Sequence, residues 1–450
     1  MDKAISPLDG RYGKRLAHLG VYFSEYALMR MRLRVELLFL QALDQTGLFP
    51  PLNAAEQQAI AAKLSEFKKD DYRRIKAIEA EINHDVKACE VFLRQALNLR
   101  NPNMIHFGLT SEDVNNLAYA LLLKDYLEQQ QLPQLKSLMA QLAGHAKKWC
   151  GDPFPARTHG QMASPTTAGK EMAVYLNRLW RVYDALEHFR FRAKLNGATG
   201  NYSALLAAFP QYDWLDFSQR FVQTLGLEFN VATTQIEDHD TYGEYFALNK
   251  QTANIVLDLD RDMWLYLTLG YLTMEADTGA VGSSTMPHKV NPINFENSEG
   301  NLQLAIALFN GITDKLGNSR LQRDLSDSTV QRNMGVALTH SYLAVQETLK
   351  GLSRLRLNRP RCLAELRAHP ELLAEPIQTI LRREGFVNPY NLLKEITRGR
   401  RVSHEDLQDF IRGLDVPQKV KDELLALKVE NYLGLAQKIC LSVLQKVSLL

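Results

Sequence analysis

The chain has 450 residues, of which 46% are hydrophobic, so it can bury a large core and is not globally disordered. Its 53 basic and 51 acidic side chains nearly cancel, to a net charge of +2, which excludes a strong overall attraction to nucleic acid or to a membrane. The four cysteines stand far apart without a CxxC pair, as expected of structural thiols rather than a zinc or redox site. The start lacks an apolar signal region and no long uncharged apolar run occurs, so we expect a cytoplasmic protein of two or three domains.

The apolar pattern predicts helices along the whole chain. Residues 1–110 are expected to form shorter helices joined by loops. From residue 168, apolar residues recur at alternating steps of four and three, which is typical of a long helix with a coiled-coil-like seam. The seam consists of Ala168, Met172, Tyr175, Leu179, Val182, Leu186 and Phe189.

Two further long helices are predicted in the second half. Tyr242–Met274 is apolar-rich and free of proline, which indicates a helix of roughly 30 residues or about 45 Å. A third runs from Ser328 to Arg356, capped by Asp327 or Ser328 and stopped before Pro360. Beyond Pro360 the sequence is more charged and again predicts short helices.

Together these elements predict an all-α fold, because no alternating strand pattern is long enough for a major sheet. We expect three helical domains, at residues 1–112, 113–360 and 361–450, with a long central helix bundle in the middle domain. Apolar faces of this length favour oligomerisation, and a monomeric bundle remains the alternative.

Polar clusters interrupt the helical pattern in the first half. Asp9–Gly13 contains an arginine suited to phosphate or carboxylate, although taken alone the segment is more typical of a solvated N-terminal turn. In Asn83–Lys87 an imidazole stands beside a carboxylate that can hold it in one tautomer. Thr110–Asp113 has the composition of a helix N-cap, whose free N–H groups can also bind an anion. In Arg157–Gln161, His159 lies in a loop between prolines and is a candidate acid.

Two more clusters follow in the second half. Residues 282–292 read Gly-Ser-Ser-Thr-Met-Pro-His-Lys-Val-Asn-Pro, which is too polar and too bent for a helix or a core strand and indicates a reactive loop. Residues 320–332 are rich in arginine. Alternating charge of this kind is usually a solvated face, but Arg323, Ser328 and Arg332 could instead clamp a phosphate beside a helix start.

Several motifs that define other classes of enzyme are missing from the sequence. The sequence contains no GxGxxG, no GxxxxGK[ST] and no HExxH, so nucleotide-dependent redox chemistry, P-loop hydrolysis and zincin chemistry lose support. What remains is acid and base chemistry from Ser, His, Lys and Arg, with neither a cofactor nor a metal.

The 282–292 loop resembles the signature loop of the fumarase/aspartase superfamily, whose members release fumarate by β-elimination. Histidine at position 288, before Lys289, is similar to the adenylosuccinate lyase version of this loop. The clusters described above, together with Thr233–Glu237 and Arg323–Thr329, resemble bacterial adenylosuccinate lyase motifs in the same order. One departure is Met162, where the family often has proline after His-Gly-Gln.

The resemblance implies a three-domain helical homotetramer whose active sites are shared between subunits. It implies cofactor-free cleavage of adenylosuccinate to AMP and of SAICAR to AICAR, with fumarate released each time. Ser283 would be the base and His159 the acid, Lys289 and Asn291 would stabilise the developing charge, and Glu296 would partner the catalytic histidine. Gly282 would be the hinge of the closing loop.

The resemblance also assigns residues that would contact the substrate. The residues that would hold the nucleotide phosphate are Arg11, Tyr12, Arg323, Ser328 and Arg332, and Thr329 would be a further substrate contact. The residues that would hold the base and the succinyl group are Asn83, His84, Asp85, Thr110, Ser111, Gln235 and Asn297. His84 is also counted among the catalytic residues.

Three other interpretations stay open at this point. The chain could be another lyase of the superfamily, such as an argininosuccinate lyase, although His288 and the arginine-serine cluster argue against it. It could be a structural protein that has lost its chemistry, as lens crystallins of this superfamily have, although Ser283, His159, Lys289 and Glu296 are all present. A helical scaffold without a small-molecule site would leave the polar clusters unexplained.

Overall fold

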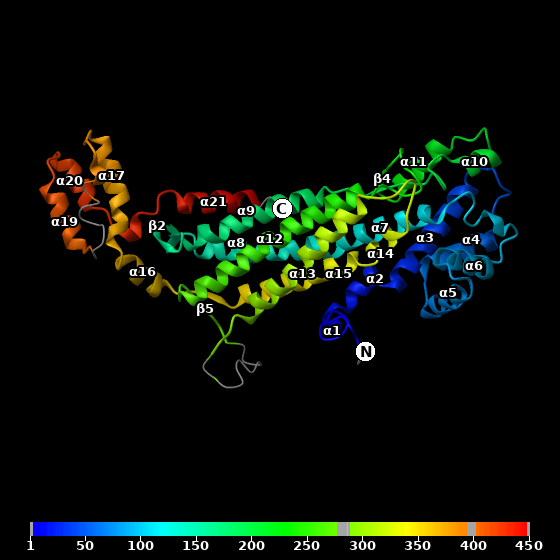
Figure 1. The fold of residues 1–450 in the computed structure, drawn as a ribbon, viewed down its shortest axis with the longest axis horizontal. Coiled ribbons are helices and arrows are strands. Elements are labelled where there is room, and N and C mark those ends of the chain that lie inside the picture. The colour runs from blue at the N-terminus through cyan, green and yellow to red at the C-terminus, as the bar shows by residue number, and fades with distance from the viewer. Residues whose placement is uncertain (1–2, 277–285, 287–288, 392, 394–401, 448–450) are drawn as a thin grey trace. The chain divides into compact units, whose positions relative to one another are not determined.

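The computed structural model describes residues 3–276, 286, 289–391, 393 and 402–447 (Figure 1). The described chain is predominantly helical, and its strands form only two-stranded sheets, which confirms the all-α class. Within the described ranges, no helix combines the length and apolarity needed to cross a membrane.

The chain forms two compact units, each assembled from separate stretches of sequence. Unit 1 comprises Met1–Gln134, Val182–Asn254 and Gly300–Ala344, and unit 2 comprises Leu135–Arg181, Ile255–Glu299 and Val345–Leu450. The division into three consecutive domains stays a prediction.

Unit 1 is built on short and medium helices. Its elements are α1 (Gly13–Leu16), η1 (Ala17–Leu19), α2 (Gly20–Phe23), α3 (Glu25–Asp44), α4 (Ala54–Ser65), α5 (Lys69–Ile82), α6 (Asp85–Leu97), η2 (Pro102–Met104), α7 (Ser111–Tyr126), η3 (Leu127–Gln131), β3 (Arg192–Ala193), α10 (Ser203–Ala208), α11 (Trp214–Thr224), β4 (Glu228–Phe229) and α14 (Ser326–Gln331). β3 and β4 pair in parallel. Side-chain caps define several starts: Ser24 accepts from the Ala27 N–H before α3, and Asn53 accepts from the Glu56 N–H before α4.

Unit 2 contains two antiparallel strand pairs and the C-terminal helices. Its elements are β1 (Pro153–Thr158), β2 (Gln161–Thr167), β5 (Leu272–Met274), β6 (Leu355–Leu357), α16 (Arg359–Arg367), η4 (Pro370–Leu373), α17 (Ala374–Arg383), α19 (His404–Gly413), α20 (Gln418–Leu425), η5 (Val429–Asn431) and α21 (Ala436–Val447). A separate apolar core, which includes Leu366, Ile377 and Leu407, holds the short C-terminal helices together.

The long helices contribute residues to both units. They are α8 (Leu132–Lys148), α9 (Ala168–Glu187), α12 (Asp240–Thr268), α13 (Ile293–Leu316) and α15 (Met334–Ser353). The predicted seam of α9 is confirmed from Ala168 to Leu186, where each seam residue is at most 5% exposed, but Phe189 lies beyond the helix end.

Two predicted helices extend too far. The predicted Tyr242–Met274 helix is α12, which stops at Thr268 because Gly270 adopts a left-handed φ of 73°. The chain then forms β5, which pairs with β6 in the register Leu272↔Leu357. β6 itself covers the predicted end of the Ser328–Arg356 helix, so the last turns of both predicted helices are the two strands of one small sheet.

The Ser328–Arg356 prediction is also wrong in its first half, which is divided into α14 and α15. The Asn333 side chain donates to the Thr329 carbonyl at 3.0 Å, while the Asn333 backbone N–H donates to Val330 instead. A side chain that takes the carbonyl four residues back replaces the helical backbone bond, and the helix is interrupted there. Two longer helices, α3 and α13, occur where the sequence predicted only short helices or none.

Candidate active site

The two units hold different parts of the predicted site. Unit 2 carries His159, Lys289, Asn291, Glu296 and Asn297, whereas Ser283 and Gly282 lie outside the described residues. Unit 1 carries every other predicted contact: Arg11, Tyr12, Asn83, His84, Asp85, Thr110, Ser111, Gln235, Arg323, Ser328, Thr329 and Arg332.

The segment around His84 joins α5 to α6. Asn83 takes a left-handed φ of 53°, which ends α5. The His84 Nδ1 accepts the Lys87 backbone N–H at 3.2 Å and so caps α6. The expected tautomer lock by the neighbouring carboxylate is wrong, because Asp85 Oδ1 lies 3.9 Å from Nδ1 and this nitrogen is taken by the backbone. Nδ1 of His84 therefore acts as a hydrogen-bond acceptor, on a side chain that is 52% exposed.

Asp85 points to two arginines instead. Its Oδ2 lies 2.8 Å from Arg32 and 3.4 Å from Arg332. Burial opposes ionisation of this carboxyl, but the two guanidinium groups outweigh it and lower the pKa of Asp85. The structure thus joins two predicted residues, Asp85 and Arg332, through a charge-assisted contact. Arg32 is 3% exposed and was not predicted, because from sequence it is one of many arginines on a helix.

The predicted N-cap at Thr110 is confirmed. Asp113 closes a capping box by accepting the Thr110 N–H at 2.9 Å. Its other oxygen accepts the Asn196 N–H at 3.0 Å and lies 3.0 Å from the Lys194 ammonium, which is fully buried. Both carboxylate oxygens of Asp113 are therefore used to hold the start of α7 against residues 194–197. The neighbouring residue Ser111 is partly exposed.

Arg323 is the centre of a buried polar group rather than part of a solvated face. Its guanidinium lies 3.3 Å from Glu112 and 3.8 Å from Asp327, and it donates to the Gln235 side-chain oxygen at 3.4 Å. Gln235 in turn donates to the Ala198 carbonyl at 3.0 Å. The structure therefore brings together Arg323 and Gln235, which the sequence predicted as contacts of one ligand. The solvated interpretation holds for Arg320, whose side chain is 84% exposed.

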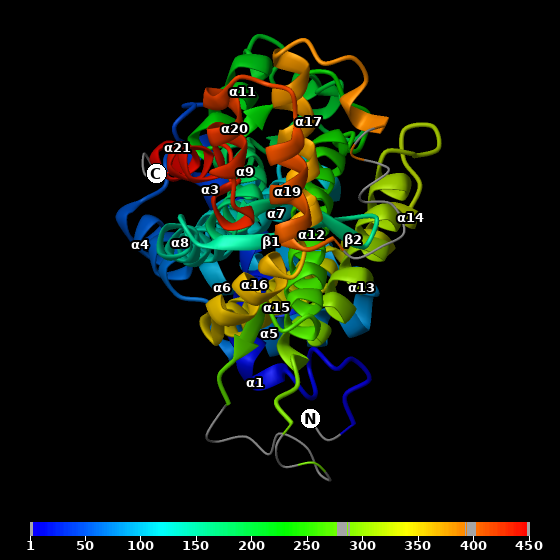
Figure 2. The same cartoon turned by 90° about the vertical axis from the view of Figure 1, so that its left-hand side faces the viewer.

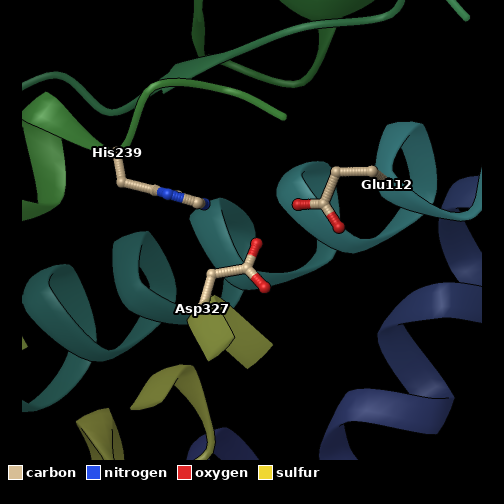
Figure 3. A group of neighbouring side chains, drawn as sticks. All are labelled: Glu112, His239 and Asp327. Carbon is tan, nitrogen blue, oxygen red and sulfur yellow. The ribbon is translucent and has the colours of Figure 1, made fainter. Parts of the chain in front are cut away.

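Glu112, Asp327 and His239 converge from three elements: α7, α14 and the residue before α12 (Figure 3). Each offers one ligand atom, and these atoms lie within 4.8 Å of one another. Burial raises the pKa of Glu112 to about 7, with the facing Asp327 carboxylate acting in the same direction, and burial lowers the pKa of His239 to about 4. A metal ion would bring positive charge to these three side chains, but the Arg323 guanidinium beside Glu112 and Asp327 already supplies it.

The remaining predicted phosphate contacts are less enclosed. Arg11 lies over the Tyr12 ring at 5.9 Å. Ser328 donates its hydroxyl to the Leu325 carbonyl at 2.9 Å, and Thr329 is exposed. A helix does begin within two residues of the predicted start, at Ser326, but this helix, α14, has only six residues. A helix this short adds little dipole field, so any anion would depend on the side chains.

His159 lies in the turn of a β-hairpin, not in an irregular loop, because Thr158 and Gln161 on either side of the turn pair with each other. The two strands of the hairpin, β1 and β2, are labelled in Figure 2. The two turn residues His159 and Gly160 have φ values of 54° and 76°. Positive φ at both central residues is typical of a type I′ turn. Arg157 donates to the Gly160 carbonyl at 3.1 Å, which ties the turn down while the His159 side chain stays exposed.

The groups that follow the 282–292 loop lie at the start of α13. Glu296 is in the first helical turn, and its Oε1 accepts the Trp264 indole N–H at 3.1 Å. Lys289 and Glu296 are both exposed, and Asn291 and Asn297 are partly buried. Within the chain, Glu296 is thus engaged by α12, and its predicted pairing with His159 stays a prediction.

The fold and these residues define a lyase, since the Lyase family model matches residues 10–305 and the Adenylosuccinate lyase C-terminal model matches residues 319–433. Similar proteins are the adenylosuccinate lyases of Haemophilus influenzae (45% identical over 441 residues) and Vibrio cholerae (46% over 442 residues), each alignment covering 96% of this chain and 97% of the relative. The chain belongs to the adenylosuccinate lyase family.

Two solved structures share the fold at low identity. A fumarate lyase from Mesorhizobium sp. BNC1 superposes with a TM-score of 0.78 at 18% identity, covering 96% of this chain and 97% of that one. The 3-carboxy-cis,cis-muconate lactonizing enzyme from Pseudomonas putida superposes with a TM-score of 0.77 at 20% identity, with the same coverage.

Proposed function

We propose that the protein is an adenylosuccinate lyase that cleaves adenylosuccinate to AMP and fumarate, and SAICAR to AICAR and fumarate, in the cytoplasm. The observation that carries the proposal is near-full-length identity of 45–46% to adenylosuccinate lyases, with all the predicted acid, base and charge-stabilising residues present. The Arg323 and Arg332 groups of unit 1 support it, because they offer two guanidinium forks suited to a phosphorylated ligand.

The reaction is an elimination in two proton transfers. Ser283, in its alkoxide form, which the Lys289 ammonium would favour, takes a proton from the carbon beside a succinyl carboxylate, and the electron pair of that C–H bond moves into the carboxylate. The C–N bond then breaks, its electrons go to the nitrogen, and His159 donates a proton to that nitrogen. An exposed imidazole on a tied hairpin tip is suited to this task, because it can reach a leaving group beyond its own strand pair.

Negative charge develops on the carboxylate during the first step. Lys289 and Asn291 stand seven and five residues before Glu296, respectively, and would meet this charge with an ammonium and an amide. Glu296 would partner the catalytic histidine. In the chain itself Glu296 accepts from Trp264, so this pairing is proposed between subunits.

We also propose a homotetramer whose sites are shared. Large apolar side chains on the long helices support it. In unit 2, Val174 of α9, Trp264 and Leu265 of α12 and Ile293 of α13 are 41%, 40%, 49% and 57% exposed, respectively. Exposed apolar side chains on long helices are expected where another chain covers the surface.

The direct test is to incubate the purified protein with adenylosuccinate and measure AMP and fumarate by chromatography, with the mass of the protein measured in parallel. Equal amounts of both products from a particle four times the mass of one 51.1 kDa chain are expected. A folded tetramer that releases neither product, or that cleaves argininosuccinate instead, contradicts the proposal.

A further inference from the structure

The two arginines proposed to hold the phosphate are linked through the interior of unit 1. Arg332 contacts Asp85 at 3.4 Å, and Asp85 contacts Arg32 at 2.8 Å. Arg32 then donates from Nε to the Asn115 side-chain oxygen at 2.9 Å. Asp85 therefore connects an exposed arginine to a buried one.

The network continues from Asn115 to the second arginine. The Asn115 amide donates to Glu112 Oε2 at 3.4 Å, and the same oxygen lies 3.3 Å from Arg323. Arg32 is 3% exposed, Asn115 8% and Glu112 0%, so water competes little with these contacts. One continuous set of hydrogen bonds and ion pairs thus reaches from Arg332 to Arg323.

A cavity lies beside one end of this network. Arg32, Asp85 and Arg332 line a space of about 170 Å³, together with Tyr119 and Gln331. The Arg332 donors that the network does not use therefore have room for a ligand nearby.

A metal ion is the alternative occupant of the Glu112, His239 and Asp327 group. Glu112 Oε1, His239 Nδ1, Asp327 Oδ2 and Arg323 Nε are buried without a hydrogen-bond partner. The Arg323 guanidinium lies among these carboxylates, at 3.3 and 3.8 Å, so a divalent cation would be placed directly against a fixed positive charge. The arrangement therefore fits carboxylates that hold an arginine better than it fits a metal site.

We propose that Glu112, Asn115 and Arg32 are positioning residues that hold the Arg323 and Arg332 guanidinium groups together as one preset phosphate-binding pair. The inference rests on the proposed function, because it takes the phosphate of the nucleotide as the ligand of the two arginines. Arginine carries five N–H donors, so contacts on one edge orient the fork and leave the other donors free. Fixing the fork before binding reduces the entropy lost when the phosphate arrives.

The test measures AMP and adenosine affinities by calorimetry on the intact protein, because the two ligands differ only in the phosphate. Glu112→Gln keeps the side-chain shape but removes the charge that orients Arg323. We expect it to weaken AMP binding about tenfold, the effect of losing one charge-assisted contact, and to leave adenosine binding unchanged. In an Arg323→Ala background the same change should alter the preference for AMP no further, because Glu112 acts through Arg323.

Glu56→Gln is the matched control. Glu56 is also buried, 5% exposed, and is paired with an arginine at 3.0 Å, but its partner is Arg100. It should keep the wild-type preference for AMP over adenosine. If Glu112→Gln does not fold, Arg32→Lys is the second variant, since it keeps the charge beside Asp85 but replaces the two nitrogens that meet Asn115 and Asp85 with a single one.

The pH dependence of AMP affinity is a second measurement, and it would not change if Glu112 had only a structural role. The charged and titratable groups around Glu112 are Arg323, Asp327, His239, Lys194, Tyr119 and Tyr242. Burial raises the pKa of Glu112 to about 7, so its carboxylate is present above that pH and lost below it. The ratio of wild-type to Glu112→Gln affinity for AMP, in which titration of the ligand cancels, should therefore be large at pH 8 and approach one near pH 6.

The outcomes separate the two proposals. A wild-type protein that neither binds AMP nor cleaves adenylosuccinate contradicts the proposed function itself. A wild type that does both, beside a Glu112→Gln variant with an unchanged or stronger preference for AMP, overturns the positioning role alone.

Discussion

At the scale of single residues, His159 combines a reactive group with an uncommon backbone conformation. Its φ of 54° lies in the left-handed region, where most side chains are strained and asparagine is tolerated. The hairpin geometry and the imidazole chemistry can therefore be separated by one substitution.

His159→Asn turns the tip into Asn-Gly, the pair that favours a type I′ turn, and removes the proposed acid. We expect turnover of adenylosuccinate to fall by at least about 100-fold, the usual contribution of a general acid, with an unchanged melting temperature. His188→Asn is the matched control, because His188 is an exposed histidine whose side chain is 70% accessible, and it should keep full activity. Turnover within about tenfold of the wild type in His159→Asn would remove His159 from the role of acid.

Sequence identifies the polar residues of the site better than their environments. The identities of Arg323, Gln235 and Asp85 are visible in short motifs, and the structure joins each of them to a partner. Their partial burial is not visible, because it depends on segments that are far apart in sequence, such as α7 and α14, and that meet only in the fold. For the same reason Arg32 and Glu112, which belong to helices that look ordinary, gain their importance only from the fold.

At the scale of elements, helix contacts depend on a few glycines. Gly169, in the first turn of α9, lies so close to the end of α8 that an added Cβ would be 2.5 Å from the Ala146 carbonyl oxygen and from the Cys150 Cα. These are backbone atoms, which cannot rotate away as a side chain can.

Gly169→Ala should therefore lower the free energy of unfolding by roughly 1–3 kcal/mol, the usual range for overpacking. Gly144→Ala on α8 is the control, since an added Cβ there meets nothing within 4 Å. It should raise stability by about 0.5–1 kcal/mol, because alanine loses less entropy in a helix. Chemical denaturation at fixed protein concentration measures both, and equal midpoints for the two variants would contradict the close contact.

Elements were predictable where one local pattern dominates. The seam of α9 repeats over several turns and was placed within two residues of its observed end. The sequence predicts helix ends where β5 and β6 lie, because segments as short as Leu-Thr-Met and Leu-Arg-Leu fit either structure and only their mutual pairing decides. The break at Asn333 depends on a single side-chain hydrogen bond, for which the sequence offers no pattern.

At the scale of the whole molecule, the proposed sharing of active sites predicts recovery between defective subunits. His159→Asn and Ser283→Ala tetramers should each be inactive. After the two are mixed, dissociated and reassembled, some sites should receive an intact His159 from one subunit and an intact Ser283 from another. Random assortment gives roughly a quarter of wild-type activity if two different subunits supply these residues.

The control mixture combines His159→Asn with His159→Ala, which offers no intact acid and should stay inactive. Activity is measured as fumarate release, and subunit exchange is verified by mass spectrometry of the mixed tetramers. Exchanged tetramers without recovered activity would place His159 and Ser283 of each site on the same subunit.

The separation of the predicted site between two units also bears on how this enzyme could diversify. Residues that would recognise the nucleotide belong to unit 1, apart from Asn297, and those that would move protons or stabilise charge belong to unit 2, apart from His84. Changes of leaving group can therefore accumulate in unit 1 while the elimination chemistry is inherited intact. Laboratory selection for a new succinylated amine should accordingly enrich substitutions near Arg323 and Arg332, and leave His159, Lys289 and Glu296 untouched.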